Sequence, residues 1–515
     1  MRLILTGTSL LASVLAAAAQ CPDYATYSQE PHGDRSTGPL ALPYMRPSPE
    51  CRTFNSSAVE QVIVDMTQRL KDPDLARLFE NTFPNTLDTT VKYFNATENL
   101  AFIITGDIRA QWLRDTANQF AHYAPLLSSD PALATLVKAV INNEARYVSE
   151  YPYCGAFQPP AESGLAPSHN DWADGVTVNP PVNNQTVFEC KYEIDSLCGF
   201  LKLSRSYYQA TEDSSFMNEN WYNAVNQIFR VIDEQSQGTF DDNFNFISYY
   251  NWTGGNGALS PAVINRGNGE PKEYTGMVGT HHRPSDDLSV YAFLTPANAM
   301  LSVELDHLSD ILVSSGQAKS GNGKKISSKA TMLSKRIEEA VWAHSLEDNV
   351  FAYETNGFGS RNIMDDANVP SLLALPYLGF LKKTHPAYIK TRKLLLSKQN
   401  PYYAAGQNFS GIGGPHVDVW HPWPMSLISA IYGTDDDTEI TTMLYSIAKN
   451  TVGLGLIHES QSIYDATSYT RSWFAWANSY FAEMLLDLAQ RKPGLIFHNN
   501  FPYKPGQNEH AHREF

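Results

Sequence analysis

Positive charge is scarce in this sequence. The 515 residues include 38 Lys and Arg against 54 Asp and Glu, which gives a formal net charge of -16. Because phosphate groups are bound by basic surfaces, this balance argues against a nucleic-acid partner. Hydrophobic residues make up 43% and charged residues 18% of the chain, so we expect a globular body. An acidic surface is compatible with a neutral substrate such as a sugar, but does not by itself indicate one.

Long apolar runs are missing beyond the N-terminus. Arg2 precedes an apolar run over residues 3–14 and small residues over 15–19. This pattern predicts a signal peptide at residues 1–19, cleaved just before Gln20 or Cys21. A membrane anchor would need ~20 apolar residues, more than this run contains. The sequence therefore predicts a secreted protein with no membrane partner. The medium, the cell wall and a compartment of the secretory pathway all remain open as its final location.

Cysteines are few, and no pair of them has the spacing of a zinc site. An oxidising compartment would pair four of the five and leave one over. We expect one disulfide between Cys21 and Cys51 and another between Cys154 and Cys190, with Cys198 as a buried free thiol. Five Asn-x-Ser/Thr sequons agree with export: Asn55, Asn95, Asn184, Asn251 and Asn408.

Sustained strand alternation is also scarce, and short strands are expected only at 101–105, 246–250 and 350–354. Residues 20–56 are rich in Pro, Tyr, Ser and Gly and predict an extended N-terminal arm.

From residue 57 the pattern is helical, with about a dozen segments; the one after Pro131 has apolar residues at helical spacing. Long loops at 151–187, 251–284 and 399–424 separate them. We predict a single all-α domain over 57–515, an (α/α)6 barrel whose loops form a pocket at one end; the alternative is an irregular helical enzyme.

Carboxylates and aromatic residues recur together in short clusters, and sugar sites use both. The first cluster, at 105–115, contains Asp107, Trp112, Arg114 and Asp115. It is equally compatible with a pocket wall and with Asp115 simply capping a helix. The second cluster, at 188–195, contains Glu189, Lys191 and Asp195. A solvated helix start explains this second pattern as well as function does.

The third cluster is HHRPSDD, with Arg283, Asp286 and Asp287. Ser285 after a proline predicts an N-cap, which would place both aspartates in a first helical turn and lower their pKa. A general acid needs a raised pKa, which burial and the adjacent like charge would favour. An exposed acidic helix cap is the alternative.

Two further clusters contain carboxylates in loops. Asp365 lies in a polar loop before Pro370, where turn and capping chemistry is the simpler interpretation. His458 and Glu459 follow a glycine-marked apolar run, GLGLI, which would deliver a carboxylate able to hold a water molecule. Surface exposure is the alternative for these two residues.

Taken together and in this order, the clusters resemble glycoside hydrolase family 125, the exo-α-1,6-mannosidases. The resemblance runs from about Asp65 to about Leu488 and looks like that of a secreted fungal member. The matching segments are TGDIRAQWLRDTANQ, KYEIDSLC, RPSDD, MDDANVPSLL, ALPYLG, GLIHES and SWFAWANSYF. The sequence departs from the family at Phe188, where a tryptophan is frequent, at Gln461, where an aromatic residue is common, and at 280–282 before RPSDD. These departures leave the catalytic pair intact. They bear on the leaving-group side of the site, and therefore on which glycan is preferred.

The resemblance implies a barrel of paired helices and removal of non-reducing-end mannose from α-1,6 linkages with inversion. It implies that Asp286 is the general acid and Glu459 the general base. Residues Asp107, Trp112, Arg114 and Asp115 would shape the mannose subsite. Lesser candidates for sugar contact or support are Glu189, Lys191, Asp195, Arg283, Asp287, Asp365 and His458.

The mechanism implied is a single displacement, with carboxyl groups roughly 6.5–9.5 Å apart. We expect an oligosaccharide substrate of N-glycan or mannan type, no cofactor or metal, and a monomer. Two alternatives come from other classes: a polysaccharide lyase on the same barrel and a non-catalytic glycan-binding protein. Acidic charge disfavours the lyase, and the presence of both Asp286 and Glu459 disfavours the binding protein.

Overall fold

The structure, a computed structural model, describes residues 21–254 and 264–506, and the predicted signal peptide lies outside these ranges. The described chain is mostly helical. Its helices are α1 Tyr24–Tyr27, α2 Ser57–Arg69, α3 Pro73–Thr82, α4 Asn85–Thr89, α5 Leu113–Ala121, α6 Pro131–Glu150, α7 Ile194–Thr211, α8 Glu219–Gln235, α9 Ile264–Gly267, α10 Thr295–Ser314, α11 Gly321–Ser345, α12 Pro386–Leu395, α13 Pro424–Tyr432, α14 Asp437–Lys449, α15 Ala475–Arg491 and α16 Pro493–Ile496.

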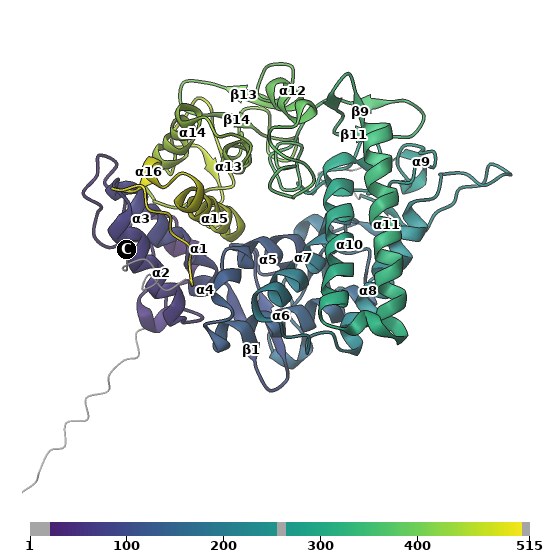
Figure 1. The fold of residues 1–515 in the computed structure, drawn as a ribbon, viewed down its shortest axis with the longest axis horizontal. Helices are drawn as coiled ribbons and strands as arrows, with labels where there is room; N and C mark the ends of the chain where they lie inside the picture. The colour runs from purple at the N-terminus through teal and green to yellow at the C-terminus, as the bar shows by residue number, and fades with distance from the viewer. Residues whose placement is uncertain (1–20, 255–263, 507–515) are drawn as a thin grey trace, which may run out of the picture.

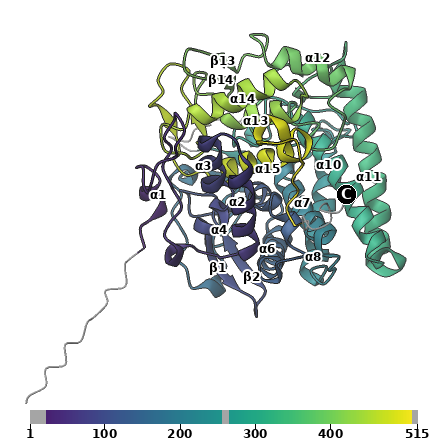
Figure 2. The ribbon, with the colours of Figure 1, turned by 60° about the vertical axis from the view of Figure 1, so that its left-hand side comes forward.

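The helices follow one another around a circuit (Figure 1). Helix α5 packs against α7 and α15, α7 against α10, and α13 against α15. Four helices pack outside these: α6, α8, α11 and α14. Helix α6 packs against α7 and α8, α11 packs against α10, and α14 packs against α13. Because α15 also contacts α3 and α4, the two ends of the helical region lie side by side (Figure 2).

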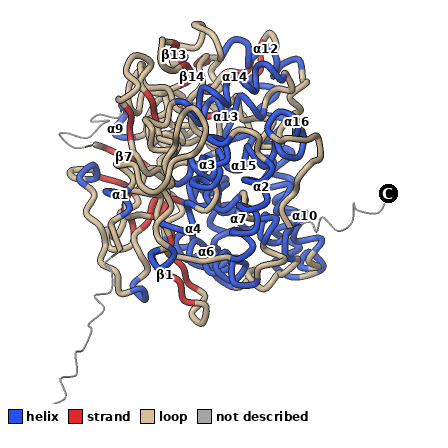
Figure 3. Tube along the Cα trace, turned by 90° about the vertical axis from the view of Figure 1, so that its left-hand side faces the viewer, coloured by secondary structure: helices blue, strands red, loops and turns tan. Residues whose placement is uncertain are grey.

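Short antiparallel strands connect the helices and gather with the long loops toward one face of the molecule (Figure 3). They are β1 Val91–Asn95, β2 Leu100–Ile103, β3 Gln111–Trp112, β4 Ala156–Phe157, β5 Thr177–Asn179, β6 Val187–Glu189, β7 Asn251–Thr253, β8 Phe293–Leu294, β9 Leu346–Glu347, β10 Val350–Phe351, β11 Glu354–Thr355, β12 Arg361–Asn362, β13 Tyr403–Ala405, β14 Ser410–Ile412, β15 Ser460–Gln461 and β16 Tyr469–Thr470. The predicted strands at 101–105 and 350–354 correspond to β2 and to β10 with β11. No strand forms over 246–250.

Local sequence signals explain where several helices begin. In α6, Asp130 accepts from the backbone N–H groups of Ala132 and Leu133 at 3.1 and 3.0 Å, and Pro131 occupies the first turn. Residues 371–380, which follow Pro370, form turns rather than a regular helix. Pro376 lies inside this segment, where its missing N–H and its ring prevent a regular helix.

The N-terminal segment before α2 is held to the helical body by contacts such as that of Arg46, whose Nε donates to Asp88 Oδ2 at 2.7 Å. Both predicted disulfides are present, Cys21–Cys51 and Cys154–Cys190, and Cys198 is a buried free thiol. Two disulfides are typical of an extracellular or secretory-pathway protein. Within the described ranges, none of the helices combines the length and apolar character needed to cross a membrane.

Candidate active site

The loop after β2, strand β3 and the first turn of α5 provide four of the predicted residues: Asp107, Trp112, Arg114 and Asp115. Gly106 determines where this loop runs. Its φ is +145°, and a Cβ added there would lie 2.4 Å from the carbonyl oxygen of Trp473. Glycine is therefore required for the loop to approach the segment before α15.

The Arg114 guanidinium is buried among four carboxyl groups. Its Nη1 donates to Glu193 Oε2 at 2.6 Å and lies 3.6 Å from Asp195 Oδ2. Its Nε lies 3.4 Å from Asp115 Oδ1, and its Nη2 lies 3.8 Å from Asp286 Oδ1. Burial disfavours the charged form, but these carboxylates, Glu193 foremost, outweigh it and raise the pKa of Arg114. The cation therefore holds these side chains together.

Asp286 lies in a tight turn, so the predicted helix start at Ser285 is wrong. The backbone at Asp286 is left-handed, with φ of +68°. Its N–H donates to the carbonyl of Arg283 at 2.9 Å, and the Arg283 N–H donates to the carbonyl of Asp287 at 2.7 Å. Ser285 Oγ donates to the carboxyl groups of Asp287 and Asp366 rather than accepting from a helical N–H.

The two aspartates of this turn have different surroundings. Burial acts to raise the pKa of Asp286, but Lys191 and Arg114 outweigh it and hold this pKa below its ordinary value. Burial, with the nearby carboxylate of Asp366, raises the pKa of Asp287 to about 6. Asp286 alone of the two lines a cavity, with 21% of its side chain exposed.

Glu459 enters the same cavity from the start of β15. Its N–H donates to the carbonyl of Thr470 at 3.2 Å, as part of the β15–β16 hairpin. Its Oε2 accepts from Thr470 Oγ1 at 2.8 Å, and its Oε1 accepts from Arg471 Nε at 3.1 Å. Arg471 Nη1 also donates to Asp107 Oδ1 at 2.7 Å. Two donors therefore fix the orientation of the Glu459 carboxylate and tie it to the first cluster.

The cavity combines charged groups with aromatic walls. Six of the residues predicted from the sequence line it: Asp107, Trp112, Arg114, Asp115, Asp286 and Glu459. Aromatic walls come from Trp112, Trp423, Phe474 and Trp476. Such walls pack on the apolar faces of sugar rings, and carboxylates accept hydrogen bonds from hydroxyl groups. With two carboxyl groups in one cavity, one can protonate a leaving oxygen while the other activates water.

The second cluster lies behind the cavity rather than in its lining. Glu189 and Lys191 form a buried ion pair at 2.9 Å. Lys191 is close enough to Asp286 to lower its pKa. Asp195 is fully buried below Arg114, and burial raises the pKa of this carboxyl to about 6.

Four further predicted residues lie outside the cavity lining: Arg283, Asp287, Asp365 and His458. Arg283 donates to Glu354 Oε1 at 2.7 Å in a buried ion pair that anchors the Asp286 turn. The ring nitrogens of His458 lie 3.2 and 3.1 Å from the carbonyls of Arg471 and Thr451. Burial lowers the pKa of His458 to about 4. His458 therefore supports the segment that carries Arg471.

Asp365 caps the turn segment after Pro370. Its two carboxyl oxygens accept from the backbone N–H groups of Leu372 and Leu373 at 2.9 and 3.0 Å. Burial raises the pKa of Asp365 to about 8. The structure thus places Asp365 in a backbone-capping position and not against a substrate.

Sequence reasoning did not select several residues of this site: Glu193, His416, Trp423, Arg471, Phe474 and Trp476. Glu193, Phe474 and Trp476 belong to the quoted segments KYEIDSLC and SWFAWANSYF, so the signal to examine them was present. Arg471 gave no local signal, because its partner Asp107 is 364 positions away in sequence.

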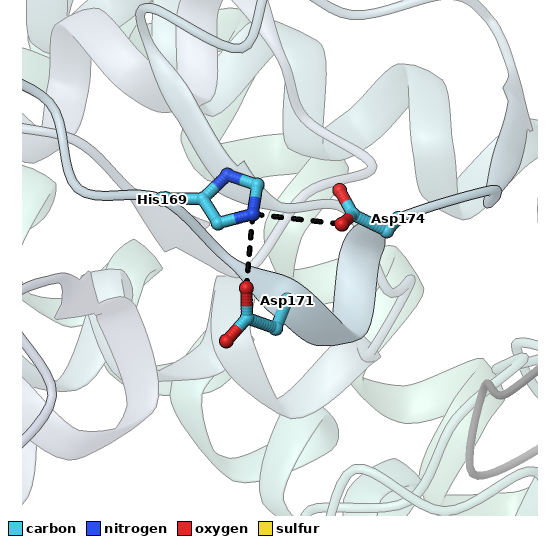
Figure 4. Close-up of side chains that lie close together, drawn as sticks. All are labelled: His169, Asp171 and Asp174. Carbon is cyan, nitrogen blue, oxygen red and sulfur yellow. Dashed lines mark ion pairs between the residues drawn. The ribbon is translucent and has the colours of Figure 1, made fainter.

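One cluster with metal-ligand geometry is not part of the cavity lining; Figure 4 shows its side chains. Among the described residues, the side chains close enough to share an ion are His169, Asp171 and Asp174, all exposed. His169 Nε2 lies 2.9 Å from Asp171 Oδ1 and 3.5 Å from Asp174 Oδ2. These ion pairs account for the arrangement, and none of the three residues lines the cavity.

Comparison with known proteins gives a consistent result. Residues 72–486 match the family model of the metal-independent α-mannosidases, glycoside hydrolase family 125. The chain is also 45% identical over 490 residues to the meiotically up-regulated gene 157 protein of Schizosaccharomyces pombe. That alignment covers 93% of this chain and 94% of the relative.

A solved structure extends the comparison to three dimensions. The chain is similar to a Streptococcus pneumoniae protein from a family of metal-independent α-mannosidases, crystallised as a non-productive substrate complex with α-1,6-mannobiose. The two share 29% sequence identity and superpose with a TM-score of 0.76. The superposition covers 84% of this chain and 99% of that protein.

Proposed function

Because the chain belongs to glycoside hydrolase family 125, the metal-independent α-mannosidases, we propose that it removes non-reducing-end mannose from α-1,6-linked mannosides with inversion. The observation that carries this proposal is the meeting of Asp286 and Glu459 in one cavity with aromatic walls. The α-1,6-mannobiose bound to the Streptococcus pneumoniae relative supports the choice of linkage.

In the proposed reaction, Asp286 protonates the departing glycosidic oxygen. Glu459 removes a proton from a water molecule that attacks the anomeric carbon from the opposite face. Thr470 and Arg471 orient the Glu459 carboxylate for this task. We expect the carboxyl groups of Asp286 and Glu459 to lie roughly 6.5–9.5 Å apart, which leaves room for the water.

The other predicted residues take binding or supporting roles. Asp107, Asp115 and Arg114 line the cavity and would contact mannose hydroxyl groups, while Trp112 would pack on the ring. Glu189, Lys191 and Asp195 would set the charge behind Asp286. The remaining supporting residues, which hold the loops of the site, are Arg283, Asp287, Asp365 and His458.

The architecture that best fits these roles is a single-domain (α/α)6 barrel over residues 57–515, preceded by a signal peptide at 1–19 and an arm at 20–56. Alternate packing of α5, α7, α10, α13 and α15 inside and α6, α8, α11 and α14 outside supports it. Residues 371–380 would take the sixth inner position. Two disulfides support entry into the secretory pathway.

The test follows the products released from α-1,6-mannobiose by NMR. Inversion predicts that β-mannose appears first and then equilibrates with the α anomer. The α-1,2- and α-1,3-linked disaccharides serve as linkage controls. Initial release of α-mannose would contradict the single displacement, and no release at all would contradict the function.

A second experiment tests whether Glu459 is the general base. Glu459→Gln keeps the size of the side chain but cannot accept the proton of water. We expect turnover to fall by about 10²–10⁴-fold while mannoside binding, measured by calorimetry, changes little. Normal turnover in this variant would show that Glu459 is not the base.

A further inference from the structure

The loop over residues 413–423 contributes two side chains to the cavity and exposes others to solvent. His416 and Trp423 both line the cavity, and the centroids of their rings lie 6.0 Å apart. Between them, Val419 and Trp420 are 47% and 53% exposed. Three residues span at most about 11 Å of chain, so Trp420 cannot lie far from the cavity wall at Trp423. This exposed part of the loop therefore belongs to the rim of the cavity.

The start of this loop is attached to the turn that carries Asp286. The carbonyl of Gly413 accepts from the N–H of Ala367 at 3.1 Å. The adjacent Asp366 accepts from the hydroxyl of Ser285, the residue before Asp286. Because the proposed acid protonates the departing oxygen, the leaving part of the glycan begins on the side of Asp286. The loop is therefore next to the leaving part of the substrate.

The end of the loop pairs with the strand that carries the proposed base. The carbonyl groups of Trp420 and Pro422 accept from the N–H groups of Ile463 and Gln461, both at 3.0 Å. This pairing continues from β15, which follows the base in sequence. Tyr464, the residue after Ile463, is 72% exposed. Two exposed aromatic rings, those of Trp420 and Tyr464, therefore lie on paired segments at the rim.

Side-chain contacts fix the backbone of both segments. His421 Nδ1 lies 2.9 Å from each carboxyl oxygen of Asp418, and His421 Nε2 lies 3.0 Å from Ser468 Oγ on the other segment. The side-chain amide of Asn408 donates to the carbonyl of Ser462 at 2.9 Å. Because the rim is held in place before a ligand arrives, binding there requires little ordering of the protein.

The chemistry of the rim fits a neutral sugar chain. Residues 413–423 and 460–470 contain no Lys or Arg, so these segments offer no cation to attract a phosphorylated glycan or another anionic partner. Aromatic faces pack on the apolar faces of sugar rings. The rim is continuous with the cavity through His416 and Trp423, so its most direct occupant is a further part of the same glycan.

We propose that Trp420 and Tyr464 form a second sugar-binding surface, which holds the second or third sugar of the leaving chain of an α-1,6-linked mannooligosaccharide. This inference rests on the proposed function and makes its substrate more specific. A disaccharide occupies only the cavity and the first position outside it, whereas a tetrasaccharide reaches the rim. The two rings determine specificity for chain length and take no part in bond cleavage.

The test compares α-1,6-mannotetraose with α-1,6-mannobiose, using initial rates of mannose release by the full-length protein. The wild type should have the higher kcat/KM on the tetrasaccharide, because binding energy from remote sugars assists the reaction. Trp420→Ala should lower kcat/KM on the tetrasaccharide by about tenfold, through the loss of ring stacking and burial. The loss on mannobiose should be far smaller. Tyr464→Ala should act in the same direction, and Trp420→Phe should restore most of the preference.

The matched control is Tyr445→Ala, which removes an aromatic ring of similar exposure, 52%, from the outer helix α14. It should leave the ratio between the two substrates unchanged. Equal losses on both substrates in Trp420→Ala would overturn the proposal and show that Trp420 only supports the loop. An unchanged ratio would also overturn it; if gel filtration then showed that Trp420→Ala dissociates a dimer, the surface would be an interface between copies. These results leave the proposed function intact, whereas absence of mannose release by the wild type from either sugar would refute the function itself.

A binding measurement separates recognition from turnover. In the Glu459→Gln background, calorimetry should give a lower Kd for α-1,6-mannotetraose than for α-1,6-mannobiose. Adding Trp420→Ala should remove most of that difference, and adding Tyr445→Ala should preserve it. Equal Kd values for the two sugars in Glu459→Gln would overturn the proposal, because the rim would then contribute nothing to binding.

Discussion

Asp286 and Asp287 are adjacent in sequence, but their environments predict different effects of substitution. Asp286 lines the cavity, whereas Asp287 is hydrogen-bonded to Ser285 and has a pKa raised by burial to about 6. Asp286→Asn should lower kcat/KM on α-1,6-mannobiose by about 10²–10⁴-fold, because the path for the proton is lost. Asp287→Asn replaces a carboxyl that is about half protonated at pH 6 by an amide of similar size outside the cavity lining, and should cost less than about tenfold. Steady-state kinetics at pH 6 compares them.

The reverse ranking would reassign the acid to Asp287. Circular dichroism and thermal unfolding of both variants show whether a loss of activity reflects the chemistry or the fold. A rate on 2,4-dinitrophenyl α-mannoside that survives in Asp286→Asn supports the assignment, since that substrate does not need an acid.

Residues of this site could be predicted from the sequence where the signal was local. Asp107, Trp112, Arg114 and Asp115 stand within nine positions of one another, and the structure keeps them in one place. Glu193 and Arg471 gain their roles from partners 79 and 364 positions away. Such partners are set by how helices pack, which neither spacing nor composition expresses.

At the scale of elements, a helix start can be recognised from the sequence only where the capping side chain keeps the backbone N–H groups of the first turn as hydrogen-bond partners. Asp130 caps α6: its Oδ1 accepts from the free N–H groups of the first turn, and its Oδ2 accepts from Ser56 Oγ at 2.5 Å. Ser285 has the same local pattern, but its hydroxyl donates to Asp366 and Asp287 instead. Those acceptors come from folding of a distant loop and of the turn itself, so the cap signal was misleading.

Removal of the Cys154–Cys190 disulfide is expected to affect both stability and activity. It joins the loop after α6 to the segment that carries Glu189, Lys191 and Glu193. Replacing both cysteines by alanine should lower stability by about 2–4 kcal/mol, the usual effect of a disulfide. It should also lower kcat on α-1,6-mannobiose, because Glu193 and Lys191 would be held less firmly. Differential scanning calorimetry and kinetics measure the two effects.

The other disulfide is the control. Cys21–Cys51 spans a similar separation, 30 residues against 36, but both of its residues lie in the segment before α2. The Cys21→Ala, Cys51→Ala double variant should lose a comparable amount of stability and keep its kcat. If both double variants lost activity equally, a positional role for Cys154–Cys190 would be ruled out.

At the scale of the whole molecule, the N-terminal segment completes the packing of the first helices. Arg46 is 4% exposed, and its Nε donates to the buried Asp88 at 2.7 Å. Met45 and Leu42 are buried with it. The abundance of Pro, Tyr, Ser and Gly in this segment predicted an extended arm, and composition alone does not show that such an arm packs against the body.

The whole molecule also buries carboxyl groups away from the site, and these link its stability to pH. Burial raises the pKa of Glu144 to about 8 and that of Asp365 to about 8. A carboxyl group with a raised folded-state pKa stabilises the protein fully below its unfolded pKa, near 4 to 4.5. That contribution is lost as the pH rises through the folded value, because the unfolded chain releases its proton first.

Buried histidines act in the opposite direction. Burial lowers the pKa of His122 to about 3 and the pKa of His458 to about 4. Their contribution is present above the ordinary pKa of about 6.5 and is lost as the pH falls toward these values, since only the unfolded histidine accepts the proton. Between about 4.5 and 6.5 the two kinds of group oppose each other, so the wild-type curve alone does not separate them.

The variant Glu144→Gln isolates one carboxyl group. Glutamine resembles the protonated acid, with an amide oxygen to accept from Gln111 and an N–H to replace the carboxyl O–H. The unfolding free energy of the variant minus that of the wild type should rise with pH from about 4.5 to about 8 and then level off, because only the wild type has a proton to lose. The rise should be on the order of a few kcal/mol. Urea unfolding at intervals between pH 5 and 9 measures it, and a difference that stays constant across that range would show that Glu144 is ionised in the folded protein.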